Sequence, residues 1–203
     1  MRHIIDAISD TDHDPILKRL FLQTRVIAIM GLSPRTERPS HRIATYLLDQ
    51  GYTIIPVNPN HTEILNRPAY PNLKEVPHQV DLVDVFRRPE YIPGIVRASI
   101  DKNVRTLWLQ DGVVHPEAAK EAAAAGIQVV MDRCIYRDHK RLIHGIPLGR
   151  ILGEFRTQQG VSLETVARQI GMTVQELDAL ENNPESAICP DMVKHIASAI
   201  EGP

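Results

Sequence analysis

Five short apolar runs alternate with amphipathic segments along the first two thirds of the chain, and this alternation constrains the fold more than any other feature. Most of the runs have the length of a strand and are apolar at nearly every position, as in strands buried on both faces. The predicted strands are 26–30, 52–57, 81–86, 106–109 and 127–131. Strands separated by helices form parallel sheets through right-handed crossovers. The sequence therefore predicts an α/β fold with a Rossmann-like, doubly wound parallel sheet of about five strands.

The segments between these strands show helical periodicity. Residues 90–101 repeat apolar side chains at the spacing of one helix face, and Gly51 and Gly126 follow two other periodic segments as typical helix stops. The predicted helices are 14–21, 39–50, 90–101, 116–125 and 136–143.

The pattern changes near residue 145. Residues 145–149 contain two glycines and a proline, which is typical of a linker, and beyond them only helical periodicity remains. We therefore predict two domains, 1–144 and 148–203.

The segments that follow the predicted strands are the candidate ligand site, because ligands bind doubly wound sheets beyond the carboxyl ends of the strands. Gly31 lets a ligand approach the backbone closely, and the next helix offers free N–H groups near Ser40, which favours an anion. The dinucleotide fingerprint GxGxxG is absent, because Ser33 and Thr36 stand where it needs glycines. Asn58, rather than an acid, follows the second strand. These features argue against NAD as the ligand of this site.

Six short motifs at the strand ends resemble the stand-alone CoA-binding protein family, which is similar to the CoA-binding domain of succinyl-CoA synthetase α subunits. The resemblance covers about residues 14–141. The motifs are GLSP (31–34), RPSHRIA (38–44), PVNP (56–59), VDVFRRPE (83–90), WLQDGV (108–113) and VVMDRC (129–134).

The resemblance implies that coenzyme A, or an acyl-CoA, is the ligand, and it implies a role for each motif. The implied cofactor-binding residues are Gly31, Ser33 and Ser40 near the phosphates and pantetheine, Val57, Asn58 and Pro59 on the nucleotide side, Phe86 against the cofactor, Arg87 at a phosphate, and Gln110 and Gly112 beside the pantetheine arm.

The charges of the loops agree with this ligand. Coenzyme A carries a pyrophosphate and a 3′-phosphate, so its site needs cations and free N–H groups. Five arginines come from the loops at one edge of the sheet: Arg35, Arg38, Arg42, Arg87 and Arg88. We add Arg38 and Arg88 to the predicted site. The alternative interpretation is that these arginines are solvated surface charges.

No catalytic group or metal site is predicted. Arg133 precedes Cys134 and could lower its pKa, so a mixed disulfide with the CoA thiol or an acyl-carrying thiol is one interpretation. An inert buried thiol is the preferred one, because no His or Asp follows at a triad-like position. Asp81 and Asp84 are three residues apart on a strand and should face opposite sides, which argues against an acid–base pair. The histidines are scattered and match no metal-ligand spacing.

The second predicted domain resembles a helix-turn-helix of the lambda-repressor/Cro type. Residues 148–203 contain four lysines and arginines against eight acids, a net charge of −4. The expected recognition helix, 173–183, carries three acids and no basic residue, which disfavours DNA binding. Protein interaction or homodimerisation is the preferred role. The predicted features are a helix at 151–155, a cap at Ser162, a turn at Gly171, the helix 173–183 and a last helix at 191–200.

Together these features predict a cytoplasmic CoA-binding or sensing module without a catalytic site of its own. The chain has no apolar stretch long enough to span a membrane, no N-terminal secretory signal and only two distant cysteines. Two alternatives stay open. One is a CoA-responsive DNA-binding transcription regulator, and the other is an NAD-dependent or acyl-CoA-processing enzyme.

Overall fold

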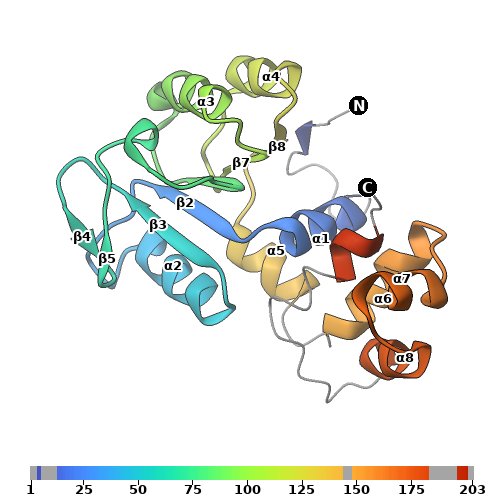
Figure 1. Cartoon of the computed structure of the whole chain (residues 1–203). Coiled ribbons are helices and arrows are strands. Elements are labelled where there is room, and N and C mark those ends of the chain that lie inside the picture. The colour runs from blue at the N-terminus through green and yellow to red at the C-terminus, as the bar shows by residue number, and fades with distance from the viewer. Residues whose placement is uncertain (1–3, 6–12, 144–147, 183–195, 201–203) are drawn as a thin grey trace. The chain divides into compact units, whose positions relative to one another are not determined.

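The computed structural model describes residues 4–5, 13–143, 148–182 and 196–200 (Figure 1). Its contacts divide the chain into two compact units. The first unit is Met1–His13 with Thr24–Asp138, and the second is Asp14–Gln23 with His139–Pro203. The domain boundaries expected from the sequence stay a prediction.

The first unit is built on a parallel sheet of six strands in the order β1-β8-β7-β6-β2-β3. Five of them match the predicted strands, shortened by one residue at some ends. The sixth, β1, was not predicted, because two residues are too few to show a period; it pairs with β8. The strands are β1 (Ile4–Ile5), β2 (Val26–Met30), β3 (Thr53–Val57), β6 (Leu82–Val85), β7 (Thr106–Leu109) and β8 (Gln128–Val130).

Helices cover both faces of this sheet, with α3 and α4 on one face and α2 on the other (Figure 1). A two-stranded antiparallel hairpin and two 3-10 helices lie in the connections. The elements are α2 (Pro39–Asp49), β4 (Glu63–Ile64), β5 (Arg67–Pro68), η1 (Leu73–Glu75), η2 (Pro89–Tyr91), α3 (Ile92–Asp101), α4 (Pro116–Ala124) and α5 (Ile135–Leu142).

The period of two in the strands sorts their side chains between the two faces. Val83 and Val85 of β6 belong to the apolar core beneath α3 and α4, together with Ile95. Asp84 lies between these valines and therefore faces the opposite side. Trp108 of β7 is fully buried, and its Nε1 donates a hydrogen bond to the Arg133 carbonyl at 2.7 Å. The indole is thus a core residue, as the sequence indicates.

The second unit is helical in its described residues. Two ion pairs and a cation–π contact join residues 14–23 to the later segments of this unit. Lys18 lies 3.0 Å from Glu154, the Arg19 guanidinium lies 5.0 Å from the Phe155 ring centroid, and Arg141 pairs with Asp14 at 2.7 Å. Its helices are α1 (Asp14–Gln23), the end of α5, α6 (Leu148–Gln158), α7 (Leu163–Ile170), α8 (Val174–Asn182) and the helical residues 196–200.

One predicted boundary of the C-terminal region changes, and another is not tested. The predicted linker, 145–149, is too long, because α6 already begins at Leu148. The start of the predicted last helix, 191–195, lies outside the described residues, as do 144–147. Within the described ranges, no helix has both the length and the apolar character needed to cross a membrane.

Candidate functional site

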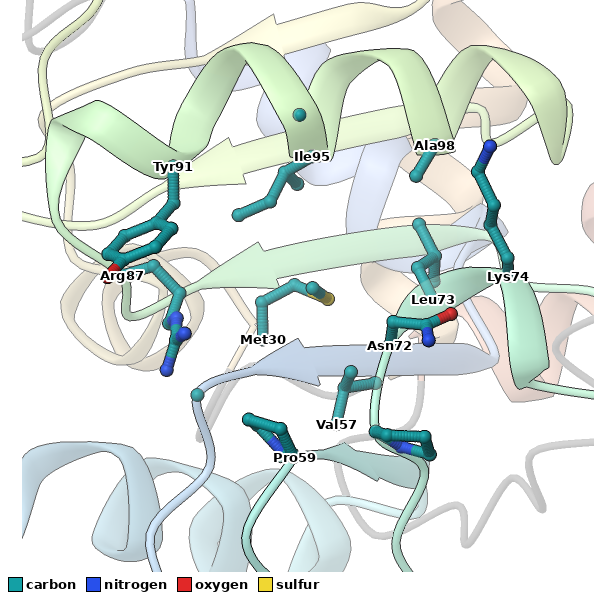
Figure 2. Close-up of a pocket in the computed structure, with 13 residues that line it drawn as sticks. Met30, Val57, Pro59, Asn72, Leu73, Lys74, Arg87, Tyr91, Ile95 and Ala98 are labelled. Atoms are coloured by element: carbon teal, nitrogen blue, oxygen red, sulfur yellow. The ribbon is translucent and has the colours of Figure 1, made fainter.

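The strand order places a topological switch point between β2 and β6. The chain passes from β2 to β3 on one side and then returns to β6 on the other side of β2. Connections that leave in opposite directions open a crevice at the carboxyl ends of the two strands. A pocket of about 320 Å³ lies there (Figure 2). Its lining residues are Met30, Gly31, Val57, Pro59, Pro71, Asn72, Leu73, Lys74, Arg87, Tyr91, Gly94, Ile95 and Ala98.

The pocket is an apolar slot with polar groups at its two ends. Val57 at the end of β3 lies on one side, and Ile95 of α3 lies on the other (Figure 2). Arg87 and Tyr91 stand together at one end, and Lys74 stands at the other (Figure 2). Lys74 is paired with Asp101 at 2.9 Å. The walls suit a flat apolar group, and the Arg87 end suits an anion.

Gly31 occupies the tightest point of this edge. Its φ of +85° is a backbone conformation that glycine adopts without steric cost. A Cβ there would lie 2.8 Å from Arg87 Cδ and 2.9 Å from the Phe86 carbonyl oxygen. The Gly31 N–H donates to the Val57 carbonyl at 2.8 Å, and the Phe86 N–H donates to the Met30 carbonyl at 2.9 Å. The ends of three strands are therefore joined where no side chain fits.

The two adjacent arginines differ sharply in environment. The Arg87 guanidinium lies 4.7 Å from the centroid of the Tyr91 ring, and no carboxylate in the described part of the chain pairs with it. The Arg88 side chain is 81% exposed, lies 3.7 Å from Glu90 and does not line the pocket. Stacking on an aromatic ring restrains Arg87 while leaving its N–H groups available. Arg87 is thus the cation that the pocket offers to a ligand.

Three of the predicted residues hold the loop after β2 in shape. The Ser33 N–H donates to Ser40 Oγ at 3.1 Å, and Ser40 is buried at the start of α2. Asn58 Nδ2 donates to the Leu32 carbonyl at 2.8 Å, and its Oδ1 accepts the Asn60 N–H at 2.9 Å. Both polar atoms of Asn58 are therefore used inside the protein.

Arg38 is exposed just before α2, and its side chain caps none of the N–H groups of that helix. Gln110 and Gly112 lie in the loop that follows β7, and β7 is the strand next to β6. The structure thus brings Gly31, Val57, Pro59 and Arg87 together in one pocket, with Phe86 at its edge. The other predicted residues lie outside the pocket lining, Ser40 in α2 and the rest in the loops that flank the pocket.

The sequence interpretation missed the wall of the pocket formed by residues 71–74 and by the start of α3. Residues 71–74 belong to a connection with no periodic signal, so nothing local marks them. Tyr91 and Ile95 could have been found from the sequence, because they lie immediately before and within the first turn of the helix that follows the motif VDVFRRPE. A helix that starts at a strand end presents its first turn to the ligand crevice.

Asp84 is the second feature that the sequence interpretation did not anticipate. Its side chain is fully buried, and burial raises its pKa to about 7, against the opposing effect of hydrogen bonds from Gln110 and from the Val85 N–H. Gln110 Nε2 donates to Asp84 Oδ1 at 2.7 Å. Asp84 Oδ2 has no partner among the described residues. Asp81, by contrast, accepts the N–H groups of Arg25 and Val26 at the start of β2.

Cys134 is a free, half-buried thiol immediately before α5, and so less buried than expected. Arg133 forms a buried ion pair with Asp138, at 2.7 Å. In the ranges that the structure describes, no group of three His, Cys, Asp or Glu side chains is arranged to hold a metal ion.

A family model described as a CoA binding domain matches residues 25–140, which include every strand of the sheet except β1. The uncharacterized protein YneT of Bacillus subtilis (strain 168) is 38% identical over 123 residues, covering 61% of this chain and 91% of YneT. The acetate–CoA ligase [ADP-forming] I of Archaeoglobus fulgidus is 30% identical over 113 residues, which are 56% of this chain and 16% of that much longer protein.

Solved structures show the same fold. A hypothetical protein from Pyrococcus horikoshii OT3 superposes with a TM-score of 0.64 at 33% identity, covering 70% of this chain and 98% of that one. A dinucleotide-forming acetyl-coenzyme A synthetase of Ca. Korarchaeum cryptofilum, at 22% identity and a TM-score of 0.51, shares the fold over 57% of this chain and 28% of its own.

Proposed function

The chain belongs to the CoA-binding domain family, and we propose that it binds coenzyme A, or an acyl-CoA, at the carboxyl edge of its sheet. The observation that carries the proposal is the pocket at the β2–β6 switch point, an apolar slot with the guanidinium of Arg87 at its end. A nucleotide with a flat apolar base and several phosphates fits that combination.

The adenine is the part of the ligand that we place in the slot. Its faces would pack between the end of β3 and α3, against Val57 and Ile95. A pocket of about 320 Å³ is small among ligand sites, which usually measure roughly 300–1,000 Å³. It accommodates the nucleoside end of coenzyme A and leaves the remainder outside, along the strand ends. Arg87 would then receive a phosphate, since guanidinium groups bind phosphate oxygens in pairs.

The loop after β2 and the loop after β7 would take the rest of the ligand. Gly31 leaves room for the pyrophosphate beside the start of α2, where backbone N–H groups favour an anion. Ser33, Ser40 and Asn58 support this loop through their hydrogen bonds. Neighbouring strands lie about 4.8 Å apart, so an arm that leaves the β2–β6 crevice next reaches the residues after β7. We therefore place the pantetheine arm beside Gln110 and Gly112.

Binding or sensing, rather than catalysis, is the role that we propose. The described pocket side chains are apolar or are arginine, lysine, asparagine and tyrosine, which hold a ligand and orient it. The alternative of an NAD-dependent enzyme has less support, because the first loop lacks the fingerprint glycines and Asn58 stands where NAD enzymes use an acid for the ribose.

Coenzyme A is expected to raise the melting temperature of the protein, and NAD to change it little. A ligand at a hundredfold excess over its dissociation constant stabilises the folded state by about 2.7 kcal/mol, which corresponds to about 5–10 °C for a chain of this size. Thermal-shift assays with CoA, acetyl-CoA, dephospho-CoA, NAD and ATP measure this. A larger shift with NAD than with CoA would contradict the proposal.

Arg87→Ala is expected to weaken CoA binding at least about tenfold, since a charge-assisted hydrogen bond contributes roughly 1.5–3 kcal/mol. Arg88→Ala is the matched control. It removes the same charge one residue away, from a side chain that is exposed and outside the pocket, and should change the affinity less than about threefold. Isothermal titration calorimetry of both variants decides the point. Equal losses would mean that only the overall charge of this edge matters.

For the C-terminal helices we propose a helix-turn-helix-like module that binds protein rather than DNA. Ser162 Oγ accepts the Thr165 N–H at the start of α7, and Gly171 ends that helix with a φ of +73°. The short turn to α8 suits such a motif. The acids of α8 do not all face solvent, however. Glu176 and Asp178 are exposed, whereas Glu181 forms a buried ion pair with Arg156 at 2.7 Å.

The full chain is accordingly expected to bind duplex DNA only weakly at physiological salt, with or without CoA. Helix α8 carries no lysine or arginine to neutralise phosphates, and its two exposed acids would face them. Fluorescence anisotropy with labelled duplexes measures the affinity. Tight, sequence-selective binding with a steep salt dependence would support the transcription-regulator alternative instead.

A further inference from the structure

We infer that Asp84 is a positioning residue that holds the side-chain amide of Gln110 in one orientation. In that orientation the side-chain carbonyl oxygen of Gln110 is a fixed acceptor for an N–H or O–H donor on the amide-bearing pantetheine arm of the ligand. This inference rests on the proposed function, because it assumes that the arm passes the loop after β7. It assigns a function to Asp84, whose carboxyl group is buried in the core of the sheet next to the site.

The position of Asp84 is an unfavourable one for a carboxyl group. It lies in the middle of β6, paired in register with Ile29 on β2 and Trp108 on β7, and its side chain is fully buried. Replacing both partners of a buried polar pair by apolar groups of similar shape is often nearly neutral or stabilising. The stability of the fold therefore does not require a polar pair of Asp84 and Gln110 at this position. A function outside the core is the simpler reason for an acid at this position.

Gln110 is the only side chain in the described part of the protein that binds Asp84. Its Nε2 donates to Asp84 Oδ1 at 2.7 Å, and its side chain makes no other hydrogen bond to the described residues. The terminal amide of glutamine is planar, and its two ends have opposite hydrogen-bonding character. Once the NH₂ end is held by Asp84, the carbonyl oxygen must point away from it. Without Asp84 the amide rotates freely between both orientations.

The backbone around Gln110 is already held from a second side. Asp111 forms a paired contact with Arg137 at 2.7 and 2.9 Å, and the Gly112 N–H donates to Asp132 Oδ1 at 2.7 Å. Gln110 is itself buried, and these contacts fix the loop without determining which end of its side-chain amide points toward Asp84. The contact with Asp84 supplies that missing constraint.

Asp84 acts through Gln110, because its own side chain lies on the far face of the sheet from the pocket. The neighbouring Val83 and Val85 belong to the core on the pocket side, so the strand alternation turns Asp84 away from it. Gln110 follows β7 at the carboxyl edge, one strand beyond Arg87. A ligand anchored by a phosphate at Arg87 reaches Gln110 only if it carries an arm that extends along this edge.

The test compares two ligands by calorimetry on the full chain: coenzyme A, and adenosine 3′,5′-bisphosphate, which lacks the pantetheine arm. Asp84→Val and Gln110→Met should each weaken CoA binding about three- to tenfold, the effect of one lost hydrogen bond, and should change the bisphosphate affinity less than twofold. The double variant should bind CoA no more weakly than Gln110→Met alone. Asp84→Asn, which keeps an oxygen for Gln110 Nε2, should recover most of the affinity lost in Asp84→Val.

The outcomes separate this inference from the proposed function. Unchanged CoA affinity in Asp84→Val, or losses that simply add in the double variant, would overturn the positioning role and leave CoA binding intact. Equal losses for both ligands would also overturn it, because a general distortion of the sheet affects the nucleotide as well. If the unaltered protein binds neither ligand, the proposed function is wrong, and the inference about Asp84 is wrong as well.

Discussion

Replacing Asp84 by Asn is expected to stabilise the folded protein at pH 8 by up to about 4 kcal/mol, because the folded state holds this carboxyl at a pKa of about 7 against an ordinary value of 3.8. A carboxyl with a raised pKa binds its proton more tightly in the folded than in the unfolded state. The free energy of unfolding therefore falls as the pH rises from about 4 to about 7, and Asn, which has no charge to bury, is spared this loss.

Urea unfolding of both proteins at pH 5, 6.5 and 8 measures the effect. The advantage of Asp84→Asn should be smallest at pH 5 and grow until the pH passes about 7. Asp49→Asn is the control. It removes a carboxyl from the exposed end of α2 and should change stability by less than about 0.5 kcal/mol at each pH. An advantage that does not depend on pH would show that Asp84 is not protonated in the folded state near neutrality.

Gly31→Ala is expected to weaken CoA binding at least about tenfold and to destabilise the fold. A left-handed φ costs an alanine roughly 1–2 kcal/mol, and here the new Cβ also meets Arg87 Cδ at 2.8 Å and the Phe86 carbonyl oxygen at 2.9 Å. Relief of these contacts moves the Arg87 side chain away from the pocket. The affinity then falls by about the value of its charge-assisted hydrogen bond to phosphate.

Gly126→Ala is the control that separates the backbone strain of an alanine at positive φ from the steric contacts that a Cβ makes at Gly31. Gly126 has a φ of +87°, close to that of Gly31, but a Cβ there would meet nothing within 4 Å. Its variant should lose the strain energy alone and bind CoA as the unaltered protein does. Thermal unfolding and calorimetry on the two variants give both quantities. If both lose CoA affinity equally, the effect of Gly31→Ala comes from the backbone strain and not from the closure of the site.

Much of the α/β unit could be predicted from the sequence, because its signals are local. A period of two or an unbroken apolar run distinguishes strands such as 26–30 from a helix such as 92–101, and alternation of the two implies a parallel sheet with ligands at its carboxyl edge. Gly31 was recognisable for the same reason, since a glycine directly after a buried strand indicates close approach of another group. The local pattern also identified Trp108 as a core residue.

Only the tertiary structure decided which side chains share the pocket. Arg87 and Arg88 are equivalent in the sequence, but Arg87 stacks on Tyr91 whereas Arg88 lies in solvent. The wall at 71–74 and the pairing of β1 with β8 depend on strand order, which joins segments far apart in the chain. The contact between Asp84 and Gln110 spans two strands and 26 residues. Local periodicity determines the helices and strands of this protein. Whether a carboxyl group such as that of Asp84 is buried, and which side chain it binds, depends on the order in which the strands pack.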